Sequence, residues 1–195
     1  MRAGTIPVAK LLDSDLITTE ESYDLIERYV LNPQITAAEI LEIDLPAKNR
    51  VEALLQSEFL TEEQLRDLAC DFAEHTLHIF ESHAPEDRRP RRCVEVARLH
   101  FAGGATSEQL ETAIRDARPS MWRFQASRYE SAFEASYAAL WLNYEDAAEM
   151  ARSVAQYAQR AAHHKARECR KNDVTPMLYR EKEASWQLAR IAEKL

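Results

Sequence analysis

The stretch TEEQLRDLACDFAEHTLHIFESHAPEDRRPRRCVEVARLHFAGG, residues 61–104, decides the fold class of this chain. It opens with a capping box, because the Thr61 hydroxyl can accept the backbone amide of Gln64 while the Gln64 side chain reaches back to the amide of Thr61. A box of this kind marks the first turn of a helix. We therefore predict a helix over 62–82.

The same stretch contains signals for a second helix. Proline is favoured in the first turn of a helix, so Pro90 suits its beginning. The pair Gly103-Gly104 suits its end, because glycine readily adopts the left-handed conformation that closes a helix. We predict this second helix over 90–102.

Further helix signals lie on both sides of residues 61–104. Three more pairs have the capping-box spacing: Thr18 with Glu21, Thr36 with Glu39, and Thr106 with Gln109. Pro46 is a further candidate for a first-turn residue. Together these signals predict four helices, over 19–31, 37–43, 47–58 and 107–118.

After Pro119 the pattern becomes a long helical stripe. Apolar side chains recur at spacings of three and four, which is one face of a single long helix, at Trp122, Ala126, Tyr129, Phe133, Tyr137 and Leu140. Asn143 can cap the next helix, in which small residues share a face at Ala147, Ala151, Ala155, Ala158 and Ala162. Thr175-Pro176 predicts the start of a last helix, with a stripe at Ala184, Leu188, Ile191 and Leu195.

The predicted fold class is all-α, a multi-helix bundle with a small N-terminal helical extension packed on it. We place an acidic N-terminal helical segment over 1–60 and the helical bundle domain over 61–195. Period-two alternation is absent, so we predict no strand. The sequence has no run of about 20 apolar residues and no signal peptide pattern, so we expect a cytoplasmic protein that does not enter a membrane.

Composition excludes several classes of enzyme. The chain has only three glycines in 195 residues. Phosphate-binding loops and nucleophile elbows need glycines where the backbone approaches a ligand, and none of their motifs occurs. We predict no catalytic residue and no cofactor. Cys70, Cys93 and Cys169 form no CxxC pair, and we expect each to be a small core residue.

Charge is unevenly distributed along the chain. The formal net charge is −8, made up of −6 over 1–60, −4 over 61–118 and +2 over 119–195. Binding to nucleic acid needs clustered Lys and Arg, so we expect no direct nucleic-acid partner. The acidity would suit a basic protein partner, whose approach it would steer, although it can equally serve solubility alone.

Two groups of His, Cys and Glu residues are candidate metal sites. The first comprises Cys70, Glu74, His75, His78, Glu81 and His83, and the second comprises His163, His164, Glu168 and Cys169. Neither contains HExxH, and no glutamate has a histidine three residues later, as a di-iron bundle requires. We predict no metal site.

Four arginines at the expected start of the second helix break a local rule. Arg88, Arg89, Arg91 and Arg92 surround Pro90, where the helix dipole disfavours positive charge. Such exceptions are expected where a compensating partner exists or at a functional site. Three nearby acids, Glu86, Asp87 and Glu95, could supply bidentate pairs, and a nucleic-acid patch is the lower-ranked alternative.

The motifs of this stretch resemble the five-like immunity family of bacterial polymorphic toxin systems. The resemblance rests on L-x-x-x-A-C-D-x-A-E-H, D-x-R-P-R and E-x-A-R, which are found here at Leu65–His75, Asp87–Arg91 and Glu95–Arg98. A late Trp-Gln, Trp186-Gln187, also fits. The matching polar residues are candidates for a polar network that is structural or binds a partner: Asp71, Glu74, His75, Asp87, Arg89, Arg91, Glu95 and Arg98.

The resemblance implies an all-helical, non-catalytic protein that binds and neutralises a toxin or other effector. Trp186 is either an anchor for the partner or the residue that docks the last helix, and we favour docking. Two alternatives remain open. One is an inhibitor of a host defence complex that mimics nucleic acid with the acidic residues of 1–60. The other is a metal-dependent helical enzyme built on His75, His78 and His163.

Overall fold

The computed structural model describes residues 4–12, 27, 29, 31–125, 127–169 and 176–195. Two expected signals, the Thr18–Glu21 box and the Thr175 cap, lie outside these residues. The N-terminal part contains β1 (Thr5–Pro7), α1 (Ala9–Leu12), β2 (Gln34–Thr36), α3 (Ala37–Glu42) and α4 (Ala47–Leu54). The remainder contains α5 (Glu62–Glu81), α6 (Arg89–Phe101), α7 (Ser107–Gln125), α8 (Glu130–Leu140), η1 (Trp141–Asn143), α9 (Ala147–Glu168) and α10 (Pro176–Ala192).

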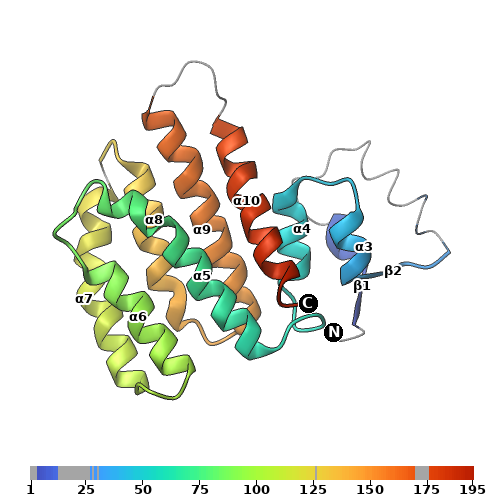
Figure 1. Cartoon of the computed structure of the whole chain (residues 1–195), viewed down its shortest axis with the longest axis horizontal. Coiled ribbons are helices and arrows are strands. Elements are labelled where there is room, and N and C mark those ends of the chain that lie inside the picture. The colour runs from blue at the N-terminus through green and yellow to red at the C-terminus, as the bar shows by residue number, and fades with distance from the viewer. Residues whose placement is uncertain (1–3, 13–26, 28, 30, 126, 170–175) are drawn as a thin grey trace.

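The fold is an all-α bundle organised around α5. This helix packs against α6, α8 and α9, and α7 lies along α6 on the side of the bundle away from α10 (Figure 1). Ten residues of α5 are buried, among them Phe72, Leu77 and Phe80. At roughly 1.5 to 3 kcal/mol for each large apolar side chain removed from water, this core is the main source of stability. The predicted fold class is confirmed.

Capping signals in the sequence correctly locate the start of several helices. Thr61 and Gln64 exchange both hydrogen bonds of a capping box at the start of α5, at 3.2 and 2.8 Å. The corresponding box opens α3 at Thr36. Gly103 has φ of +77°, so it takes the left-handed conformation that ends α6, as predicted.

The region after residue 118 differs from the prediction. Helix α7 continues through Pro119, which is exposed, because Met121 and Phe124 keep the helical spacing of its buried face. The helix ends at Gln125, and α8 begins at Glu130, so the single long helix predicted from Trp122 to Leu140 is wrong. Trp122 is 57% exposed and is not part of the core.

Two further local predictions are corrected. Asp146, and not Asn143, caps α9, because its carboxylate accepts the amide of Glu149 at 2.8 Å. The predicted absence of strands is also wrong, since β1 and β2 pair antiparallel in a small two-stranded sheet. Three-residue strands are too short to show an alternating pattern, so periodicity gave no sign of them.

The N-terminal part of the chain is packed on the bundle next to α10 (Figure 1). The backbone amide of Ala47, at the start of α4, donates to the Glu181 carboxylate at 2.6 Å. Arg152 of α9 donates to the carbonyl oxygen of Leu55 at 2.9 Å. The domain boundary near residue 60 stays a prediction.

The three cysteines have two different environments. Cys70 and Cys93 are buried, and burial raises the pKa of each thiol to about 12. Cys169 is exposed, so the expectation that it is a core residue is wrong. Its position at the C-cap of α9 places it beyond the last buried turn of that helix. None of the helices in the described ranges combines the length and apolar character needed to cross a membrane.

Candidate functional site

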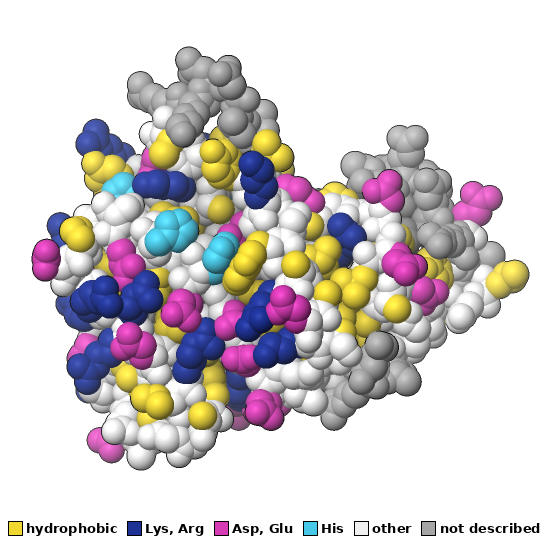
Figure 2. Space-filling model, viewed as in Figure 1, with side chains coloured by type: hydrophobic (Ala, Val, Ile, Leu, Met, Phe, Trp, Pro, Cys, Tyr) yellow, Lys and Arg dark blue, Asp and Glu magenta, His cyan; other side chains and the backbone are white. Residues whose placement is uncertain are grey.

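Helix α5 carries a row of carboxylates, here called the acid stripe, between α6 and α10. The acid stripe consists of Asp67, Asp71, Glu74 and Glu81. These residues share one face of α5 because their spacings are four, three and seven residues. In Figure 2, dark blue and magenta side chains alternate over the region where Figure 1 places α5 and α6.

Helix α6 supplies two arginines to the acid stripe. Arg98 donates to Asp71 at 2.7 Å and to Glu74 at 2.8 Å. Arg91 holds Glu81 with two hydrogen bonds, of which one is 2.8 Å, and lies 3.6 Å from Glu74. Burial alone lowers the pKa of the Arg98 guanidinium, but the hydrogen bonds to Asp71 and Glu74 raise it above its ordinary value.

Helix α10 and the turn that follows it supply two further cations from the opposite side. Arg190 donates to Asp71 at 2.6 Å, and Lys194 pairs with Asp67. The two helices run antiparallel, so the spacing of four residues between Arg190 and Lys194 matches the spacing of four between Asp71 and Asp67. Each carboxylate of the acid stripe therefore has a cation from α6, from α10 or from both.

His75 and Trp186 continue the contact between α5 and α10. The two rings stack with centroids 3.6 Å apart and planes 6° from parallel, and Phe72 meets the indole edge to face at 6.2 Å. The Nδ1 atom of His75 lies 3.0 Å from the carboxylate of Glu183, whose side chain is only 6% exposed. Gln187 donates to the same carboxylate at 3.3 Å. Trp186 is half-buried in this position.

The arginines at the start of α6 are partly compensated by neighbouring acids. Arg89 makes a bidentate pair with Asp87, at 2.8 and 2.7 Å, and Arg91 is held by Glu81 as described above. These two pairs offset the unfavourable charge at the helix start. Arg88 reaches only to 3.8 Å from Glu81, and its side chain is 67% exposed.

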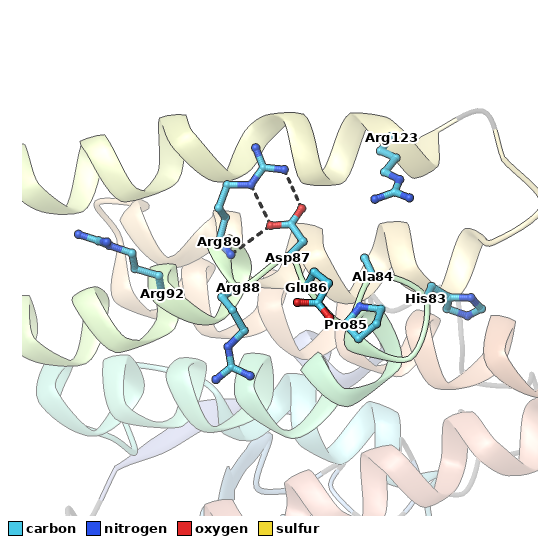
Figure 3. Close-up of a pocket in the computed structure, with 9 residues that line it drawn as sticks. All are labelled: His83, Ala84, Pro85, Glu86, Asp87, Arg88, Arg89, Arg92 and Arg123. Carbon is cyan, nitrogen blue, oxygen red and sulfur yellow. Dashed lines mark hydrogen bonds and ion pairs between the residues drawn. The ribbon is translucent and has the colours of Figure 1, made fainter.

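A hollow of about 670 Å³ lies at this helix start. We call it the arginine pocket, after the four arginines that line it: Arg88, Arg89, Arg92 and Arg123. Figure 3 shows Arg123 reaching from α7 toward the loop that carries Ala84 and Asp87. In the same view Arg88 and Arg92 extend away from the Arg89–Asp87 pair in different directions. Both side chains are exposed.

The Asp87–Arg89 pair gives a pH-dependent prediction. The hydrogen bonds from Arg89 lower the pKa of Asp87 from 3.8 to about 2. A depressed pKa contributes stability that is present above pH ~4 and is lost as the pH falls toward 2. We expect Asp87→Asn to lower the free energy of unfolding at pH 7 by about 1 kcal/mol, discounted because Arg89 is 46% exposed. Urea unfolding at pH 7 and pH 3 should show that the difference in free energy of unfolding between wild type and Asp87→Asn is smaller at pH 3. An equal difference at both pH values would show that the stabilisation does not come from the charged Asp87 carboxylate.

Metal chemistry finds no support in the arrangement of the histidines. Within the described ranges, no group of three or more His, Cys, Asp or Glu side chains could hold a metal ion. His75 faces Glu183 and Trp186, and Nδ1 of His78 contacts the carbonyl oxygen of His75 in its own helix at 2.8 Å. His163 lies on α9, where its ring is 5.4 Å from that of His164.

The candidate residues named from the sequence fall into three places. Asp71, Glu74, Arg91 and Arg98 lie in the ion-pair network along α5, while His75 lies beside Trp186. Asp87 and Arg89 pair with each other at the arginine pocket. Glu95 is exposed, and its negative charge helps to raise the pKa of Arg91. Whether any of these residues contacts a partner stays a prediction.

Sequence reasoning missed half of the network. The sequence did not single out Asp67, Glu183, Arg190 and Lys194, and it placed Glu81 only in a candidate metal group, although each of the five contacts another member of the network. The regular spacing of Asp67, Asp71 and His75, four residues apart, was the available signal for a common helix face. Their partners on α10 are more than a hundred positions away in the chain.

Comparison with known proteins identifies the family of this chain. A family model described as Imm-5 like putative immunity protein matches residues 56–194. No curated protein and no solved structure matches the chain. The matched residues include the acid stripe, its cations on α6 and α10, and Trp186, which confirms the resemblance seen in residues 61–104. Because the match covers well over half of the sequence and all of α5 to α10, the chain belongs to the Imm-5 like immunity protein family.

Proposed function

We propose that this protein is an immunity protein that neutralises a toxin by binding it directly and without catalysis. The observation that carries the proposal is the extent of the family match, residues 56–194, which includes every helix of the bundle from α5 to α10. The proposed setting is the cytoplasm, where an immunity protein protects the cell that makes the toxin.

The packing of the bundle supports an inhibitor that presents a fixed surface. Ion pairs connect α5 to α6 through Arg98 and to α10 through Arg190, and both arginines share the Asp71 carboxylate. A surface that is already ordered before binding loses little conformational freedom when a partner docks. Direct occlusion of a toxin therefore fits this protein better than an inhibitor that folds on binding.

The test is co-expression with a candidate toxin, sought among the genes that neighbour this one. We expect growth to be restored, and the purified pair to elute together in size-exclusion chromatography. A control toxin from an unrelated system should neither be neutralised nor co-elute. Failure of the purified proteins to bind, with growth still restored, would exclude direct occlusion.

Salt dependence separates this proposal from nucleic-acid mimicry by the acidic segment 1–60. Under mimicry, affinity for the partner should fall steeply with salt, and Glu42→Gln with Asp44→Asn should weaken binding, since both side chains are exposed. We expect both substitutions to leave neutralisation of the toxin unchanged.

A further inference from the structure

The positive charges of the bundle are matched along α5 but not at the start of α6. The acid stripe has four carboxylates and takes four cations: Arg91, Arg98, Arg190 and Lys194. At the arginine pocket, Asp87 satisfies Arg89 alone. Arg88 has only the 3.8 Å contact with Glu81, a carboxylate that Arg91 already holds with two hydrogen bonds.

Two more arginines of the pocket have no acidic partner among the residues that the structure describes. In the described part of the chain, neither Arg92 nor Arg123 forms an ion pair, and both side chains are exposed. Arg123 lies over the ring of Phe124, 5.5 Å from its centroid. Of the three exposed arginines, Arg88 thus has one long ion pair, and Arg92 and Arg123 have none among the described residues, in a chain whose overall charge is −8.

An apolar hollow adjoins the arginine pocket. It has a volume of about 340 Å³, lies between α6 and α7, and is lined by Val96, Leu99 and Ala105 among others. Leu99 is 55% exposed, and its side chain lines this hollow beside Val96 and Ala105. Arg92 lines both hollows, so the two form adjacent parts of one surface along α6.

We propose that this surface docks an acidic and partly apolar segment of a protein partner. Asp or Glu side chains of the segment would pair with Arg88, Arg92 and Arg123, because a guanidinium matches a carboxylate with two parallel hydrogen bonds. A neighbouring apolar side chain would cover Leu99. The inference rests on the proposed function in taking the partner to be a protein, and it adds the contact surface and its chemistry.

The surroundings of the pocket favour a protein segment over nucleic acid. Glu86 and Asp87 line the arginine pocket, and Glu108 and Asp116 line the apolar hollow. A nucleic-acid strand carries a phosphate at every nucleotide, so it would bring several charges against these carboxylates. A peptide segment can place one or two carboxylates at the arginines and an apolar side chain at the hollow.

The test uses a fluorescein-labelled synthetic peptide of alternating Glu and Leu, with binding measured by fluorescence anisotropy. We expect the triple variant Arg88→Gln, Arg92→Gln, Arg123→Gln to bind the peptide at least ~10-fold more weakly than wild type. The matched control is Arg115→Gln, Arg118→Gln, Arg167→Gln, which should change affinity by less than ~2-fold. Both triples remove three exposed arginines and one 3.8 Å ion pair, so they have the same net charge.

A variant that is expected to bind the peptide more tightly shows that the losses of affinity do not come from misfolding. Glu86 is exposed and lines the pocket, so Glu86→Gln should bind the peptide ~2-fold more tightly by removing a repelling charge. Leu99→Ser should weaken binding at the apolar hollow. Equal losses in the two triple variants would show that only net charge matters, and would overturn the inference.

Two further outcomes would also overturn it. One is the absence of peptide binding by the wild-type protein. The other is that wild type binds a single-stranded thymidine oligonucleotide more tightly than the peptide, and that the pocket triple no longer binds this oligonucleotide. Binding of the toxin itself separates this inference from the proposed function. If wild type and the pocket triple bind the toxin equally well, the proposed docking surface is wrong, while neutralisation by binding still stands. If the toxin binds neither wild type nor the pocket triple, and the peptide results are as expected, only the proposed function is wrong.

Discussion

Replacing Asp71 with alanine is expected to lower the free energy of unfolding by about 2 to 3 kcal/mol. The Asp71 side chain is 12% exposed and accepts hydrogen bonds from Arg98 at 2.7 Å and from Arg190 at 2.6 Å. Its removal leaves Arg98 and Arg190 without the carboxylate that they share. One contact of α5 with α6 and one with α10 are therefore lost. The expected loss is below that of a fully buried pair, because the two arginines are each about one-third exposed. Urea unfolding followed by circular dichroism measures it.

The control for Asp71 is a carboxylate of the same network at the surface. Glu193 also pairs with Arg190, but its side chain is 61% exposed, so Glu193→Ala should cost less than ~0.5 kcal/mol. A double-mutant cycle between Asp71→Ala and Arg190→Ala should give a coupling of about 1 kcal/mol. If Asp71→Ala costs no more than Glu193→Ala, the network does not stabilise the bundle, and its residues are better regarded as partner contacts.

Local hydrogen bonding explains why much of the bundle could be predicted from sequence. The boxes at Thr36, Thr61 and Thr106 each satisfy amides within one turn, so three or four residues suffice to locate a helix start. Gly103 is equally local, since its positive φ concerns one residue. The helix termini at these residues were predicted to within one or two positions, although the far end of α7 was not.

Tertiary packing decided the features that sequence did not predict. Proline in a helix interior costs roughly 3 kcal/mol, which argued for a break at Pro119. Burial of Met121 and Phe124 on the continuing face offsets that cost, so α7 runs on to Gln125. The small sheet joins Thr5–Pro7 to Gln34–Thr36, and no local signal reports a pairing between such distant segments.

The polar residues show the same division between local and distant information. The Arg89–Asp87 pair is two residues apart, and the acids near Pro90 made such a pair foreseeable. Arg190 and Lys194 meet Asp71 and Asp67 only because α10 packs antiparallel on α5. A family resemblance can mark Asp71 as important, but only the fold shows that its carboxylate is shared by two helices.

Trp186→Ala is expected to lower the free energy of unfolding by about 3 kcal/mol, the lower end of the range for removing a buried aromatic side chain, because Trp186 is half-buried. The indole stacks on His75 at 3.6 Å, meets Phe72 edge to face, and packs against the main hydrophobic core. Trp122→Ala is the matched control, since that indole is 57% exposed and should cost less than ~0.5 kcal/mol. Chemical unfolding of the two variants measures the contrast.

The same residue allows its two predicted roles to be separated. Trp186→Phe keeps an aromatic ring between His75 and Phe72, so it should restore most of the stability lost in Trp186→Ala. If Trp186 only docks α10, the toxin should bind Trp186→Phe as tightly as wild type, because the surface outside the helix contact is unchanged. If Trp186 is an anchor, loss of the indole should weaken toxin binding in a variant that unfolds normally, since the contribution of an anchor depends on the partner pocket that it fills. A Trp186→Phe variant that keeps its stability but binds the toxin more weakly would therefore show that Trp186 is an anchor for the partner and does more than dock α10.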